Sequence, residues 1–125
     1  MKVLSDSQVA QIIKATRDVR VPIVYATSTV GDNAIISITP IGCCDIEVKD
    51  PRYDTDAALE LLGFVMTTME KDARDRMLEM DVEWSLMVYD GDSHPWDTGV
   101  SIPISGEPFR AAVCNLAAEV LGVAQ

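Results

Sequence analysis

The sequence predicts an α+β fold in which helices pack on an antiparallel five-stranded sheet, in the order α-β-β-β-α-β-β-α. Apolar residues recur at helical spacing in three segments and alternate with polar residues in others, and these two periodicities distinguish helices from half-buried strands. The strands come in runs instead of alternating one by one with helices. That arrangement favours an antiparallel sheet over a parallel one.

Length and composition indicate a single domain over residues 1–125. The chain is 48% hydrophobic, which is enough to bury one core. Its longest apolar runs fall well short of the roughly 18–20 residues that a membrane-spanning helix needs. The apolar start of the chain is also too short for a secretory signal. We therefore expect a cytoplasmic protein without a membrane partner.

Three helices are expected, over about residues 7–17, 54–80 and 108–122. Ser5 and Gln8 fit the capping box that often begins a helix, in which each side chain bonds a backbone N–H of the other residue. The second segment is apolar nearly all round in its first half and charged in its second half. A helix of that kind is expected to be covered on two sides where it is apolar.

Five strands are expected from the alternation of apolar and polar residues. They cover about residues 23–29, 34–39, 44–48, 82–89 and 100–104. Pro103 cannot donate a hydrogen bond to a neighbouring strand, so the last of these strands is expected at the edge of the sheet.

Catalytic and metal-binding motifs are missing from the sequence. It has no P-loop, no nucleophile elbow and no H-E-x-x-H pattern, so we expect no enzyme activity and no cofactor. The only histidine, His94, lies in an acidic loop, Asp90–Asp97, for which a metal site is the alternative to a plain hairpin loop. The loop lacks the spacing of a calcium-binding loop, which favours the hairpin and no metal.

The three cysteines, Cys43, Cys44 and Cys114, do not form a disulfide framework or a zinc pattern. Strand alternation predicts that one of the two adjacent thiols faces the core and the other faces outward. Neighbouring acidic residues oppose the lowered thiol pKa that a redox role requires. A structural role is therefore expected for Cys43 and Cys44, with a redox role as the alternative.

The chain is strongly acidic. It has 20 acidic and 10 basic residues, a formal net charge of −10. Such a charge repels nucleic acid, so direct nucleic-acid binding is not expected. It suits a basic protein partner, and a solvated acidic surface that serves only solubility is the alternative.

The start of the last helix is the candidate site for a phosphorylated small molecule. Ser105 and Gly106 lead into this helix, whose first backbone N–H groups favour an anion. Arg110 could add a forked pair of hydrogen bonds, and Trp96 could stack on a base. Capping alone is the alternative, since Glu107 lies beside the site.

The second helix is the candidate oligomer interface. Its first half carries more apolar residues than one sheet can cover, and a large exposed apolar patch usually marks an interface. We expect a symmetric homodimer or higher oligomer that uses Leu59, Leu62, Phe64 or Met66.

Two resemblances suggest a biological setting. Residues Trp84–Gly122 contain a Trp-bearing strand, an acidic and aromatic loop, a strand and a helix reading E-P-F-R-A-A-V-C-N-L-A. This pattern resembles the small phage α-β-β-α sandwich proteins, over residues 57–122 at most. The resemblance implies a phage or prophage accessory protein in the host cytoplasm. Such a protein would sequester a nucleotide signal, with Arg110 as the binding residue, or inhibit a host defence protein.

The overall element order, size and acidity also resemble those of type III secretion chaperones, which are dimeric. That resemblance implies a protein that holds a segment of an effector. We therefore expect a non-catalytic binding protein that acts on a host protein or a phosphorylated small molecule. A secretion-chaperone-like protein is the alternative.

Overall fold

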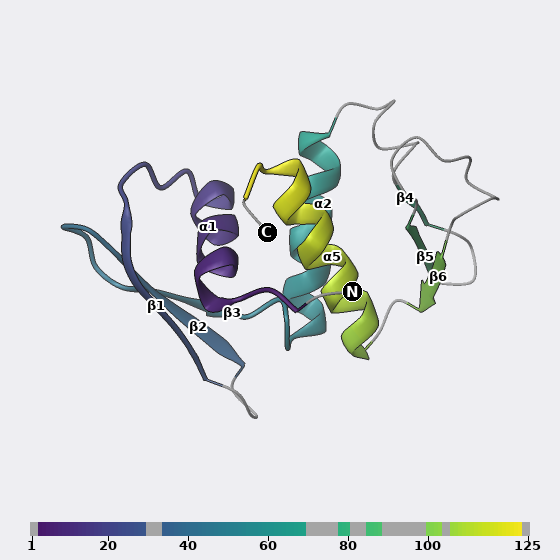
Figure 1. Cartoon of the computed structure of the whole chain (residues 1–125), viewed down its shortest axis with the longest axis horizontal. Coiled ribbons are helices and arrows are strands. Elements are labelled where there is room, and N and C mark those ends of the chain that lie inside the picture. Colours follow the sequence, from purple (N-terminus) through teal and green to yellow (C-terminus); the bar gives the residue numbers. More distant parts are fainter. Residues whose placement is uncertain are drawn as a thin grey trace.

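The computed structural model describes residues 3–29, 34–69, 78–80, 85–88, 100–103 and 106–123. Within these residues the chain forms three helices and two three-stranded antiparallel sheets (Figure 1). In chain order the elements are α1 (Asp6–Thr16), β1 (Ile23–Thr29), β2 (Ile35–Pro40), β3 (Ile46–Lys49), α2 (Thr55–Thr68), β4 (Leu78–Met80), β5 (Ser85–Val88), β6 (Val100–Pro103) and α5 (Gly106–Val120).

The α+β class is confirmed, but the prediction of one five-stranded sheet is wrong. The strand orders are β1-β2-β3 in one sheet and β4-β5-β6 in the other. The central strand β5 pairs with β6 on one side and with β4 on the other, and β4 falls where the end of the second helix was predicted. Residues Leu78–Met80 read apolar, polar, apolar, which fits a strand as well as the end of a helical stripe. Pro103 does lie on an edge strand, β6, as expected.

The second helix is also shorter than predicted, and α2 ends at Thr68. The hydroxyl of Thr67 bonds the carbonyls of Gly63 and Phe64, and the hydroxyl of Thr68 bonds the carbonyl of Phe64. Such side-chain bonds compete with the helical ladder. Met69 then adopts an extended backbone with ψ of 142°. The charged second half of the predicted helix includes residues 70–77, which lie outside the described residues.

The core lies between the first sheet and the helices. Figure 1 shows α1 against this sheet and α2 beside α5, with the second sheet on the far side of that helix pair. The predicted apolar stripes are buried, among them Val9 and Ile12 of α1, Val65 of α2 and Phe109 of α5. None of the described helices has the length and apolar character that crossing a membrane requires.

The capping box predicted for Ser5 and Gln8 is confirmed, and the other helices also have capping residues. The Ser5 side chain accepts from the Gln8 backbone N–H at 3.2 Å, and the Gln8 side chain accepts from the Ser5 N–H at 2.8 Å. Asp54 caps α2 by accepting from the Ala57 N–H at 2.9 Å. Gly122 follows α5 with a φ of +72°, a conformation that favours glycine.

Candidate functional site

The described surface contains an open groove of about 580 Å³ bounded by α1, β3 and α2. It falls within the size range of about 300–1,000 Å³ that is typical of ligand sites. Its lining residues come from three segments that the sequence does not place together. They are Ile13, Thr16, Arg17, Glu47, Val48, Lys49, Pro51, Asp54, Asp56, Ala57, Glu60, Leu61 and Phe64.

The floor of the groove is apolar. The side chains of Ile13, Pro51 and Leu61 are buried. Those of Val48 and Phe64 are half-buried, so part of their apolar surface remains accessible to solvent. An apolar floor that remains partly open to water favours contact with an apolar side chain from outside. The groove therefore offers a site where binding removes apolar surface from solvent.

The rim of the groove is charged and mainly acidic. Arg17 and Lys49 supply the basic groups, whereas Glu47, Asp56 and Glu60 are exposed acids. The carboxylate of Asp54 is also acidic, but it is already used to cap α2. The rim therefore matches the acidic balance of the whole chain.

Two of the acids, Asp56 and Glu60, stand four residues apart on α2 and so share one helix face. Like charges at this spacing destabilise a helix by about 0.2–0.5 kcal/mol. No ion pair to either carboxylate is found within the described residues. A basic group arriving from outside would relieve this repulsion.

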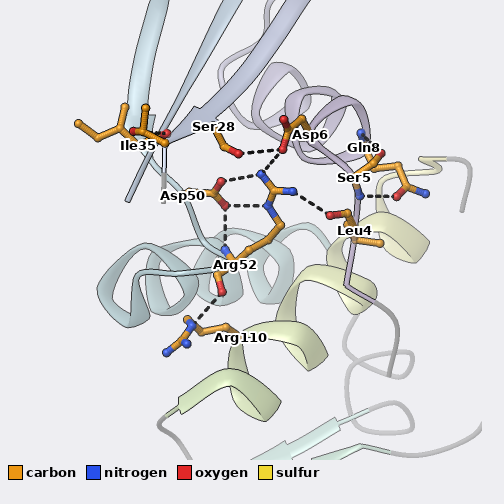
Figure 2. Close-up of polar contacts among 10 residues, drawn as sticks. Leu4, Ser5, Asp6, Gln8, Ser28, Ile35, Asp50, Arg52 and Arg110 are labelled. Carbon is orange, nitrogen blue, oxygen red and sulfur yellow. Dashed lines mark hydrogen bonds and ion pairs between the residues drawn. The ribbon is translucent and has the colours of Figure 1, made fainter. Parts of the chain in front are cut away.

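A buried network centred on Arg52 anchors the end of the groove at the turn between β3 and α2 (Figure 2). Arg52 is 6% exposed and Asp50 is fully buried. The Arg52 Nε and Nη2 donate to the two carboxylate oxygens of Asp50 at 3.1 and 2.7 Å. The Nη2 also donates to Asp6 at 2.7 Å, and the Nη1 donates to the Leu4 carbonyl at 2.8 Å. These bonds tie the start of α1 to the β3–α2 turn.

The charges of this network are mutually stabilised. Burial alone would lower the pKa of Arg52, but the hydrogen bonds to Asp50 and Asp6 outweigh it, so the pKa is raised. The hydrogen bond from Arg52 lowers the pKa of Asp6, and the Ser28 hydroxyl, which donates to Asp6 at 3.0 Å, adds to this effect. No buried side-chain polar atom lacks a partner in the described part of the chain. The network is therefore structural.

The predicted anion site is only partly described, since Ser105 and Trp96 lie outside the described residues. Gly106 begins α5 with a φ of +76°. The Arg110 Nε donates to the Arg52 carbonyl at 2.9 Å (Figure 2). Its Nη1 donates to the Thr55 hydroxyl at 3.3 Å. These contacts give Arg110 a role in joining α5 to the β3–α2 turn.

The cavity beside Arg110 is small, about 110 Å³, and Glu107 lines it. Nucleotide-sized ligands usually occupy about 300 Å³ or more. This geometry does not favour a nucleotide there, although nucleotide binding through Arg110 remains an untested prediction.

The predicted interface residues of α2 have different environments. Leu59 is 41% exposed, whereas Leu62 is 3% exposed and belongs to the core. Met66 is half-buried against the core, and Phe64 lines the groove. The four residues therefore do not form one apolar patch, and Leu59 and Phe64 are the two that a partner can reach most readily.

The remaining candidates are placed as follows. His94 and the Asp90–Asp97 loop lie outside the described residues, and no group of metal-ligating side chains is found among the residues that are described. Cys43 and Cys44 are both exposed, which corrects the prediction that one of them faces the core. They precede β3, so strand alternation does not apply to them.

Neither the groove nor the Arg52 network was predicted from the sequence, and Arg52 was not among the candidate residues. An Asp and an Arg two residues apart, on either side of a proline, were the available signal. Comparison with known proteins adds nothing to this picture, because no family model, no curated protein and no solved structure matches the chain.

Proposed function

We propose that this protein works by binding and not by catalysis, and that its groove holds a basic, partly apolar segment of a partner protein. The observation that carries this proposal is the combination of an apolar floor with the acidic wall of Asp56 and Glu60. Apolar contacts would supply affinity, and the acids would select lysine or arginine at the rim.

The elements that line the groove support a helical or extended segment as the ligand. Two of them are the helices α1 and α2, and an amphipathic helix commonly binds by laying its apolar face into a groove. Phe64 and Val48 would contact that apolar face. The net charge of −10 would speed the approach of a basic partner.

We favour the role of a phage or prophage accessory protein, which would bind a host protein through this groove. A secretion-chaperone-like protein that holds an effector segment is the alternative, and both would use the same kind of contact. The neighbouring genes would separate the two settings, since capsid and tail genes favour the first and a secretion operon favours the second.

A labelled peptide tests the groove directly. The probe is a fluorescein-labelled helical peptide with leucines on one face and lysines on the other, added to the full chain and followed by fluorescence anisotropy. Glu60→Lys should weaken its binding about tenfold or more, equivalent to about 1.4 kcal/mol. The matched control is Glu119→Lys, which makes the same change of charge on an exposed position of α5.

The control should bind like the wild type. If both lysine variants weaken binding equally, the peptide responds to net charge and the proposed site is wrong. A second pair of variants separates the apolar contribution: Phe64→Ser should weaken binding, while Leu59→Ser, on the same helix but outside the groove lining, should not. A wild type that does not bind the peptide at all would also contradict the proposal.

A further inference from the structure

The strand β1 is an edge of the first sheet, because the strand order is β1-β2-β3. An edge strand presents backbone N–H and C=O groups that no neighbour uses, and natural proteins usually protect such edges with charges, proline or a covering segment. The other edge, β3, carries this protection, since Glu47 and Lys49 lie on it and Asp45 precedes it. Charged residues therefore protect the β3 edge, whereas the β1 edge has none.

The edge strand β1 lacks charge altogether. In the sequence no acidic or basic residue occurs between Arg20 and Asp32, although acids and bases make up 24% of the chain. The strand reads Ile-Val-Tyr-Ala-Thr-Ser-Thr, a composition rich in β-branched residues. Neither its composition nor its charge opposes pairing with another strand.

Exposed apolar side chains gather at the start of this strand. Val24 is 65% exposed, Tyr25 is 62% exposed and Ile41 is 54% exposed. The Ile41 N–H donates to the Pro22 carbonyl at 2.9 Å, so Ile41 lies next to the entry of β1. Three of the six most exposed large apolar side chains in the described part of the chain thus lie at the end of the sheet where β1 begins.

We propose that the β1 edge pairs antiparallel with the β1 edge of a second copy of this chain, about a twofold axis at Thr27, to form a continuous six-stranded sheet. In this register Tyr25 faces Thr29 of the other copy, and Ala26 faces Ser28. Aromatic and β-branched side chains are favourable neighbours across antiparallel strands. A twofold contact also satisfies the requirement that the same patch be used on both copies.

The pairing would cover Tyr25–Thr29, the regular part of the strand. The register of β1 with β2 is irregular between Ile23 and Tyr25, and a bulge of this kind usually ends further pairing. The outward side chains Tyr25, Thr27 and Thr29 would continue one surface across the two copies.

A second copy fits this edge better than a charged partner does. Each chain has a formal net charge of −10, so two copies repel each other over most of their surfaces. The uncharged β1 edge is a surface on which that repulsion is smallest. A highly charged partner would have no oppositely charged side chain on β1 with which to form an ion pair.

Sedimentation analysis of the full chain tests the proposal. The wild type should sediment at twice the chain mass of 13.6 kDa as its concentration rises from the low micromolar range. Thr27→Lys and Thr27→Glu each oppose two like charges at the axis, so each should raise the dimer dissociation constant about tenfold or more. The matched control is Ser37→Lys. Ser37 pairs with Thr27 on the same face of the sheet, but on the central strand.

The Ser37→Lys control should remain dimeric. A wild type that stays monomeric at millimolar concentration overturns the proposal. So does a dimer that survives both Thr27 substitutions and is broken by Leu59→Glu, since that result would place the interface on α2. Hydrogen exchange gives an independent measurement that needs no variant. Amides of β1 should become more protected as concentration rises, and protection confined to another element would also overturn the proposal.

Discussion

Replacing Arg52 by methionine should destabilise the fold severely. The substitution keeps an unbranched apolar side chain in place of the aliphatic part of arginine but removes the four hydrogen bonds that the guanidinium donates to Asp50, Asp6 and the Leu4 carbonyl. Asp50 is fully buried, and among the described residues its carboxylate would keep only the Arg52 backbone N–H at 2.9 Å. Leaving a buried charge without its partner costs about 3–5 kcal/mol.

That loss is large against the total stability of about 5–15 kcal/mol that a domain of this size has. Loss of the hydrogen bonds from Arg52 to its other partners adds less to the cost in stability. The Asp6 side chain is 40% exposed and can recover water contacts when Arg52 is removed. With a urea slope of about 2 kcal/mol per molar, a loss of about 4 kcal/mol lowers the unfolding midpoint by about 2 M.

The assay is urea unfolding at neutral pH, followed by far-ultraviolet circular dichroism. Arg20→Met is the matched control, because Arg20 also pairs with an aspartate two residues earlier, Asp18, at 3.4 Å. Their side chains are 85% and 81% exposed, so this control should leave the midpoint unchanged. If Arg52→Met shifts the midpoint no more than Arg20→Met does, the structural role assigned to the network is wrong. The double variant Asp50→Asn with Arg52→Met should lose less than the sum of the two single changes.

Three further outcomes follow from the described contacts. The pKa of Asp6 is lowered below its ordinary value of 3.8, so its carboxylate stabilises the fold above that pH and the contribution is lost as pH falls further. Asp6→Asn should therefore flatten the acid side of a stability-against-pH curve measured by urea midpoints. Burial raises the pKa of Cys114 to about 12, so iodoacetamide should modify the exposed Cys43 and Cys44 quickly and Cys114 only after unfolding, as mass spectrometry would show. Arg110→Ala should lower the urea midpoint, because it removes the bonds that join α5 to the β3–α2 turn, and an unchanged midpoint would leave Arg110 free for a ligand role.

Local features were predictable from the sequence because their causes are local. The capping box of Ser5 and Gln8 and the cap of Asp54 depend on residues three apart in the chain. The apolar stripes of the helices follow from helical periodicity, and Pro103 on an edge strand follows from its missing N–H.

Features that depend on tertiary partners were not predictable. Leu78–Met80 fits a helix or a strand by pattern, and its pairing with β5 decides the outcome. The pairs Asp18–Arg20 and Asp50–Arg52 have the same spacing in sequence, yet one is exposed and the other is buried. Burial of the second pair depends on Leu4 and Asp6, which lie more than forty residues away in the chain.

The position of the buried network relative to the groove links stability to the proposed binding. Pro51 lies between Asp50 and Arg52 and also forms part of the groove lining, and Asp54 follows in the same turn. The network fixes this turn against the start of α1, so the two helices that line the groove are held at one separation before a ligand arrives. A site that is already ordered loses less conformational entropy on binding, which raises affinity without additional contacts. We therefore expect mild disruption of the network, such as Asp6→Asn, to weaken peptide binding in the groove even though Asp6 does not line it.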